Sequence, residues 1–154
     1  MIYKRTAYDL DGVIFPLLKR HKPFYRYSGA ERKEYEAKRL WFYRNAPLIL
    51  KPKEEEFYIV SARQYKYRFL TYEWLERNSI KYKDIHLMDA SLTFKNIVEH
   101  KSKYIKELGI TKYYEDDPKI IKYLDKLFPH IELIEVTRDE ISVKTDLDIE
   151  VPTI

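Results

Sequence analysis

The sequence predicts an α/β protein with three layers, in which a mainly parallel, five-stranded sheet lies between helices. Short apolar runs of strand length alternate with longer segments that carry apolar residues at helical spacing. Capping and turn residues separate these segments. The length of 154 residues suits one domain, because it is enough to bury a core and short for two. We therefore expect a single domain over residues 1–154, with a core at about 2–136 and a C-terminal extension at 137–154.

The expected elements follow one another in a βα alternation. The strands are expected at 2–8, 57–60, 85–88, 112–114 and 131–136. The helices are expected at 30–44, 65–77, about 92–108 and from 118 onward. Ser28 and Glu31 form a capping box before the first helix. Gly109 is typical of the residue after a helix, and Asp117 is placed to cap the helix that begins at Pro118.

The second helix carries large apolar residues that we expect to point into the core. These are Phe69, Leu70 and Trp74. The extension has a different pattern, since apolar and polar residues alternate over 141–151, which is the period of a half-buried strand. We expect an added edge strand or hairpin there. A strand shared with a second subunit, giving a homodimer, is the alternative.

Composition restricts the chemistry that this chain can use. It has no cysteine, so a metal ion must be held by oxygen or imidazole ligands. The net charge of +4 favours a phosphate-bearing partner, although Lys and Glu are interleaved and a mixed-charge surface is the alternative. No apolar run reaches the length of a membrane span, and the N-terminus lacks an apolar leader. The sequence therefore predicts a soluble, cytoplasmic protein that does not bind a membrane.

Acids and a hydroxyl follow the expected strands directly. Ligands of open α/β sheets bind outside the carboxyl ends of the strands, so the residues at those positions are the candidate site. They are 9–12 after the first strand, 61–63 after the second and 115–118 after the fourth. Carboxylates and a serine at one sheet edge are typical of magnesium and phosphate chemistry.

The segment after the first strand, Asp9-Leu10-Asp11-Gly12-Val13, resembles motif I, DxDG(T/V), of the haloacid dehalogenase (HAD) superfamily. The resemblance implies that Asp9 is the nucleophile that forms an aspartyl-phosphate and that Asp11 is the general acid and base. It also implies that Mg²⁺ is the cofactor, bound at Asp9 and Asp11 with the Leu10 backbone carbonyl. Gly12 would turn the chain toward the phosphate. An ordinary Asx-type turn is the alternative interpretation.

The segment after the second strand resembles motif II of the same family, an apolar strand that ends in Ser or Thr. By this resemblance Ser61, Ala62 and Arg63 bind the phosphate or the substrate, with the Ser61 hydroxyl as a donor. Two alternatives stay open. Ser61 can be an ordinary N-cap of the following helix, and Arg63 an exposed structural arginine.

Lys101 is the candidate for motif III, the lysine that lies before the fourth strand. It interrupts an apolar helical stripe that includes Ile97 and Leu108, where a charge is costly without a partner. Lys103 and Lys106 lie off this stripe. The resemblance gives Lys101 a catalytic role, and a lysine that extends its ammonium to solvent is the alternative.

The fourth strand ends in Glu115-Asp116-Asp117, which resembles the acidic motif IV. Asp116 aligns with the metal-binding acid of the family, and Glu115 is the second choice. Asp117 is expected to cap the next helix and to contact the metal through water. Together the four motifs predict a three-layer, HAD-like Rossmannoid fold.

The expected activity is that of a phosphoric monoester hydrolase without a large cap domain. The stretch between Gly12 and the second strand has room for the first helix and a minimal flap at about 15–27, whose cations and aromatic rings can clamp a nucleotide or form an ordinary loop. We expect an accessible phosphomonoester as substrate: a nucleotide, another phosphorylated small molecule or a nucleic-acid end. The alternative is a catalytically inactive HAD-like protein that binds nucleic acid or acts as a scaffold.

Overall fold

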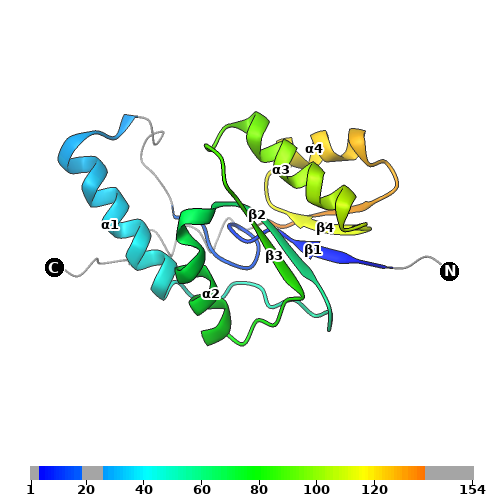
Figure 1. Cartoon of the computed structure of the whole chain (residues 1–154), viewed down its shortest axis with the longest axis horizontal. Coiled ribbons are helices and arrows are strands. Elements are labelled where there is room, and N and C mark those ends of the chain that lie inside the picture. Colours follow the sequence, from blue (N-terminus) through cyan, green and yellow to red (C-terminus); the bar gives the residue numbers. More distant parts are fainter. Residues whose placement is uncertain (1–3, 19–25, 138–154) are drawn as a thin grey trace.

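A computed structural model describes residues 4–18 and 26–137, which form a three-layer α/β fold (Figure 1). Its five strands are all parallel and lie in the order β3-β2-β1-β4-β5. The strands are β1 (Thr6–Tyr8), β2 (Tyr58–Gln64), β3 (Asp84–Met88), β4 (Lys112–Glu115) and β5 (Glu132–Glu135). The helices are α1 (Gly29–Asn45), α2 (Arg68–Arg77, after the 3-10 turn Tyr65–Tyr67), α3 (Phe94–Glu107) and α4 (Pro118–Leu127). The predicted fold class is confirmed.

The sheet separates two hydrophobic clusters, because successive side chains of each strand point to opposite faces. Tyr8 packs with Trp74 of α2 in one cluster. Its neighbour Ala7 packs with Ile105 of α3 in the other. In Figure 1, α3 and α4 accordingly cover one face of the sheet, whereas α2 lies against the other face and α1 packs against α2.

The central strand β1 lies between β2 and β4, where the order of connection along the sheet reverses. All three of its residues are buried, and Tyr8 stacks on Tyr114 of β4 with ring centroids 4.2 Å apart. Ligands of open α/β sheets bind at the carboxyl edge of such a switch point. This edge carries Asp9 directly after β1 and Glu115 at the end of β4.

Several predicted helix ends have the expected geometry. Gly109 has a φ of +64°, and the N–H groups of Gly109 and Ile110 donate to the carbonyls of Lys106 and Ile105, which is a Schellman motif. At α4, the Asp117 side chain accepts a hydrogen bond from the Lys119 N–H at 2.9 Å. The predicted cap of α4 is therefore confirmed.

Two expectations about local structure are wrong, and one of the alternatives for Ser61 is excluded. Ser28 precedes α1, but its side chain makes no capping hydrogen bond. Phe69 is 70% exposed, whereas Trp74 carries the packing of α2 with 1% exposure. Ser61 is not a helix cap, because β2 continues to Gln64 and the 3-10 turn follows it. The strand is longer than the expected 57–60, because the bulge lets β2 continue to Gln64.

Parts of two predicted segments lie outside the described residues. They are 19–25, within the expected flap, and 138–154, which includes the alternating stretch expected to form an edge strand or a dimer contact. Those expectations stay predictions. Over the described ranges, none of the helices is both long and apolar enough to span a membrane.

Candidate metal and phosphate site

The site begins with a tight turn that follows β1. The Asp9 N–H donates to the Tyr114 carbonyl at 3.0 Å, which extends the ladder between β1 and β4 by one residue. Gly12 then adopts a φ of +85°, a conformation that favours glycine. Its N–H donates to the Phe15 carbonyl at 2.6 Å. The turn holds the Asp9 side chain at the sheet edge, where its Oδ1 accepts from the Leu10 N–H at 2.7 Å.

The Leu10 carbonyl points into this turn. It accepts three main-chain hydrogen bonds, from Val13, Ile14 and Phe15, at 2.9–3.1 Å. Its lone pairs are therefore used within the turn. The expectation that this carbonyl binds Mg²⁺ does not fit the structure.

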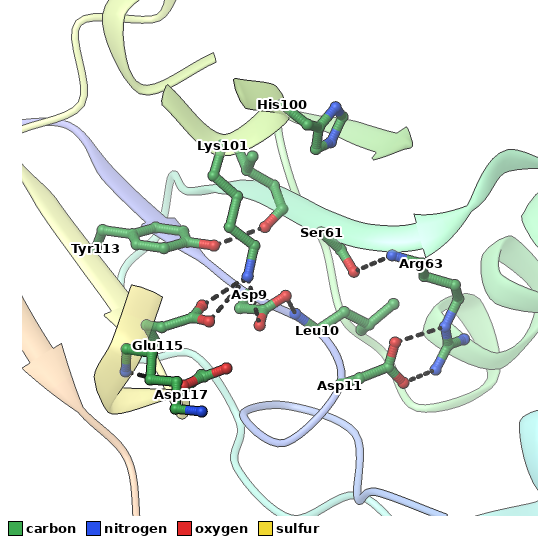
Figure 2. Close-up of polar contacts among 12 residues, drawn as sticks. Asp9, Leu10, Asp11, Ser61, Arg63, His100, Lys101, Tyr113, Glu115 and Asp117 are labelled. Carbon is green, nitrogen blue, oxygen red and sulfur yellow. Dashed lines mark hydrogen bonds and ion pairs between the residues drawn. The ribbon is translucent and has the colours of Figure 1, made fainter. Parts of the chain in front are cut away.

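Lys101 of α3 lies between two carboxylates in the interior. Its Nζ donates to Asp9 Oδ2 at 3.1 Å and to both Glu115 oxygens, at 2.9 and 2.8 Å (Figure 2). The residue is only 2% exposed, so the alternative of a lysine that reaches solvent is wrong. Burial alone would lower the pKa of the ammonium, but the charges of Asp9 and Glu115 outweigh it and raise this pKa. Lys101 is therefore a fixed cation at the site.

The single positive charge of Lys101 does not balance the two buried carboxylates of Asp9 and Glu115, and Asp116 adds a third carboxylate nearby. Oxygen atoms of Asp9, Glu115 and Asp116 lie within 4.8 Å of one another. Burial, followed by the charge of Asp9, raises the pKa of Glu115 well above its usual range. A hard divalent cation fits this all-oxygen donor set and would relieve the repulsion. The structure thus brings Asp116 and Glu115, the first and second choices for the metal-binding acid, close to Asp9. Asp117 instead caps α4.

Asp11 faces away from this cluster, toward Arg63 (Figure 2). The Arg63 Nε and Nη2 donate to the two Asp11 oxygens at 3.2 and 2.5 Å. Its guanidinium also lies 4.3 Å from the centroid of the Phe15 ring and 3.9 Å from that of Tyr43. Arg63 is 4% exposed, so the alternative of an exposed arginine is wrong. It instead fixes the orientation of Asp11.

A bulge in β2 brings Arg63 to this position. Val60 pairs with His86 and Gln64 with Met88, so the three residues between Val60 and Gln64 lie opposite a single residue of β3. Within the bulge, the Ser61 hydroxyl oxygen accepts from the Arg63 N–H at 3.0 Å, which leaves the hydroxyl proton for donation. Bulges of this kind redirect side chains beside functional sites.

A pocket of about 250 Å³ opens beside these groups. Asp9, Asp11, Ser61, Ala62 and Arg63 line one side of it. The other side is formed largely by residues that the sequence reasoning missed, namely Tyr35, Arg39, Tyr43, Gln64 and Tyr67. A signal was present, because Tyr35, Arg39 and Tyr43 recur every four residues on one face of α1. Arg39 donates to the Tyr67 hydroxyl at 3.1 Å, so this wall is itself held by polar contacts.

Replacing Glu115 with glutamine should stabilise the metal-free protein while it weakens cation binding. The folded-state pKa of Glu115 is raised, so its favourable contribution exists below the unfolded pKa and is lost as pH rises through the folded pKa. Glutamine removes this charge, and its amide can accept from Lys101 and donate to Asp9. We expect the Tm in EDTA to rise by about 2–4 °C at pH 8, with the gain shrinking toward pH 5. Differential scanning fluorimetry across pH measures it.

The matched control is Glu107→Gln, a substitution at an exposed position on α3. It should leave the pH dependence of the Tm as in the wild type. If the Tm of the Glu115→Gln variant depended on pH in the same way as that of the wild type, the assignment of the raised pKa to Glu115 would be contradicted.

Fold and site together define this chain as a Rossmann-like α/β protein with a carboxylate cluster at its sheet switch point that is suited to a divalent cation. Its fold is similar to that of a chain in the structure of the Pnkp1/Rnl/Hen1 RNA repair complex, with 17% identity and a TM-score of 0.55 over 86% of this chain and 42% of that one. A chain in a second structure of the Pnkp1/Rnl/Hen1 complex gives 19% identity and a TM-score of 0.56 over 86% and 45%. The chain thus spans less than half the length of either neighbour. No protein-family model matches the sequence, and neither does any curated protein.

Proposed function

We propose that this chain is a magnesium-dependent phosphoric monoester hydrolase of the HAD type that works through an aspartyl-phosphate on Asp9. The observation that carries the proposal is the convergence of Asp9, Glu115 and Asp116 at one sheet edge. The buried Lys101 donates to Asp9, and Asp11 follows Asp9 two residues later in the sequence. These groups come from three separate parts of the chain. A turn with local Asx hydrogen bonds would not require them to meet.

Asp9 attacks phosphorus through a carboxylate oxygen, and the bond between phosphorus and the ester oxygen breaks. Asp11, held by Arg63, takes up a proton before the attack and donates it to the leaving oxygen, which returns Asp11 to the carboxylate that Arg63 binds. A water molecule then attacks the phosphorus of the aspartyl-phosphate, Asp11 accepts its proton, and the bond to Asp9 breaks to release phosphate. Ser61 donates its hydroxyl hydrogen to a phosphate oxygen from the pocket wall.

The cation would be held by the oxygens of Asp9, Glu115 and Asp116. When bound, Mg²⁺ neutralises charge between the attacking carboxylate and the phosphate. Lys101 contributes a second positive charge through its hydrogen bond to Asp9 Oδ2, and it fixes the orientation of the nucleophile. Both effects are needed because an anionic nucleophile must approach an anionic substrate.

The substrate class we propose is an accessible phosphomonoester, such as a nucleotide or a nucleic-acid end. The pocket is large enough for a phosphate and part of a leaving group, and aromatic residues line its outer side. One structural neighbour is a chain of a complex named for RNA repair, which supports a nucleic-acid end among these substrates.

The test is hydrolysis of p-nitrophenyl phosphate with Mg²⁺, with EDTA and with Mg²⁺ restored. We expect activity that depends on the metal and a loss of at least about 10³-fold in kcat for Asp9→Asn, since no nucleophile remains. Asp125→Asn, an exposed substitution on α4, is the matched control and should keep full activity. Mass spectrometry should detect a phosphorylated Asp9 in the wild type. Activity that survives Asp9→Asn would contradict the covalent mechanism.

The alternative, an inactive protein of this fold that binds nucleic acid or acts as a scaffold, predicts no hydrolysis with any metal. It gives no reason for a buried lysine to lie against two carboxylates, an arrangement whose desolvation is costly. The same assay therefore separates the two functions.

A further inference from the structure

We propose that the start of α2 forms a binding surface for single-stranded nucleic acid, which leads a terminal phosphate into the pocket. This inference rests on the proposed function, because it names the polymer whose end the pocket would receive. The surface consists of Tyr65, Arg68 and Phe69, and we call it the cation–aromatic rim.

The rim exposes aromatic rings that the core does not use. Phe69 is 70% exposed and Tyr65 is 44% exposed. The Arg68 guanidinium lies 4.3 Å from the centroid of the Tyr65 ring and 4.5 Å from that of Phe69. Arg68 Nη1 also donates to the Tyr65 carbonyl at 3.3 Å, which holds the three residues together. The exposure of these rings has no packing explanation, since Trp74 and Leu75 bury the other face of α2.

The charge of the rim suits a polyanion. Within the described part of the chain, Arg68 forms no ion pair with a carboxylate. Lys66 adds an exposed ammonium 5.0 Å from the centroid of the Tyr67 ring. Proteins that bind single strands combine cations along the backbone with aromatic rings on which bases stack. A protein partner would also use Arg and aromatic residues, but a surface with unneutralised cations beside a phosphate site favours nucleic acid.

The rim is continuous with the pocket. Tyr65 lies between Gln64 and Tyr67, both of which line the pocket. Arg68 and Phe69 open α2, and helices that follow parallel strands begin at the carboxyl edge, where Asp9 lies. A single-stranded nucleic acid with its terminal phosphate at Asp9 would therefore place the nucleotides next to that phosphate over the rim.

Binding is measured by fluorescence anisotropy of a labelled, unphosphorylated single-stranded oligonucleotide in EDTA, so that no turnover occurs. We expect Phe69→Ala and Arg68→Gln each to raise the Kd about 5-fold to 100-fold relative to the wild type. Tyr123→Ala and Arg44→Gln are the matched controls, since these residues lie on α4 and in the last turn of α1. A duplex of the same sequence should bind more weakly than the single strand, because its bases are already stacked.

A second measurement compares two substrates with Mg²⁺. The ratio of kcat/KM for a terminally phosphorylated oligonucleotide to that for p-nitrophenyl phosphate should fall at least about 5-fold in the rim variants. The proposal would be overturned if the rim variants kept the wild-type kcat/KM ratio or the wild-type Kd. It would also be overturned if these variants changed only the mass of the protein in solution, which reports self-association. Binding of the oligonucleotide without hydrolysis of either ester would contradict the proposed phosphatase function but not the binding of nucleic acid at the rim. Hydrolysis of both esters without binding of the oligonucleotide would contradict the binding surface but not the phosphatase function.

Discussion

Replacing Lys101 with methionine is expected to lower the free energy of unfolding by about 3–5 kcal/mol at neutral pH, because it leaves two buried carboxylates without their shared cation. Asp9 and Glu115 are 5% and 1% exposed, so water cannot screen their repulsion. The Tm of a chain of this size should fall by roughly 10 °C. The proposed phosphatase activity should fall about 10²-fold to 10³-fold, since Asp9 loses both its orientation and a positive charge.

The deficit in stability should depend on pH in a defined direction. Lys101 lowers the pKa of Glu115, so its removal raises that pKa further above the unfolded value. The folded variant then binds more protons than the unfolded chain, and its stability rises as pH falls. Urea denaturation at pH 8 and pH 5 should therefore show a smaller deficit at pH 5. Added Mg²⁺ should also restore part of it, because the cation replaces the missing charge.

Lys106→Met is the matched control, because Lys106 lies on the same helix and is exposed. It should change stability by less than about 0.5 kcal/mol. A Lys101→Met variant as stable as this control at pH 8 would contradict the buried charge cluster.

Replacing Arg63 with methionine is expected to cost about 2–3 kcal/mol of stability and about 10²-fold in kcat. The change removes both hydrogen bonds to Asp11 and another of 3.1 Å to the Thr71 hydroxyl. We place the stability loss below that for Lys101 because the Asp11 side chain is 25% exposed and keeps part of its hydration. The catalytic loss follows because Asp11 no longer has a fixed direction.

Arg63→Lys separates orientation from charge. Lysine keeps the positive charge but lacks the planar, two-pronged donor set and cannot lie against the Phe15 and Tyr43 rings in the same way. We expect it to recover part of the stability and little of the kcat. Arg44→Met, an exposed change on α1, controls for the loss of an arginine. If Arg63→Lys restored full kcat, the positioning role would be wrong and charge alone would suffice.

The expected alternation of strands and helices was confirmed because it rests on local periodicity. Lys101 illustrates how far this reasoning extends to a site. A lysine that interrupts an apolar helical stripe needs a buried partner, and the structure supplies Asp9 and Glu115. The same reasoning could not choose between the neighbouring acids at the end of β4, since an acidic run has no period of its own.

The expected elements and the sheet edge that carries the acids followed from the sequence by itself, because apolar periodicity and turn residues are local properties of the chain. Tertiary structure decided the partners. Arg63 meets Asp11 across 52 positions, and Lys101 meets Asp9 across 92, through strand order, register and the bulge in β2. It also turned the Leu10 carbonyl inward and placed the rings of α1 along the pocket. Contacts of this kind depend on how distant segments pack, and no local pattern encodes them.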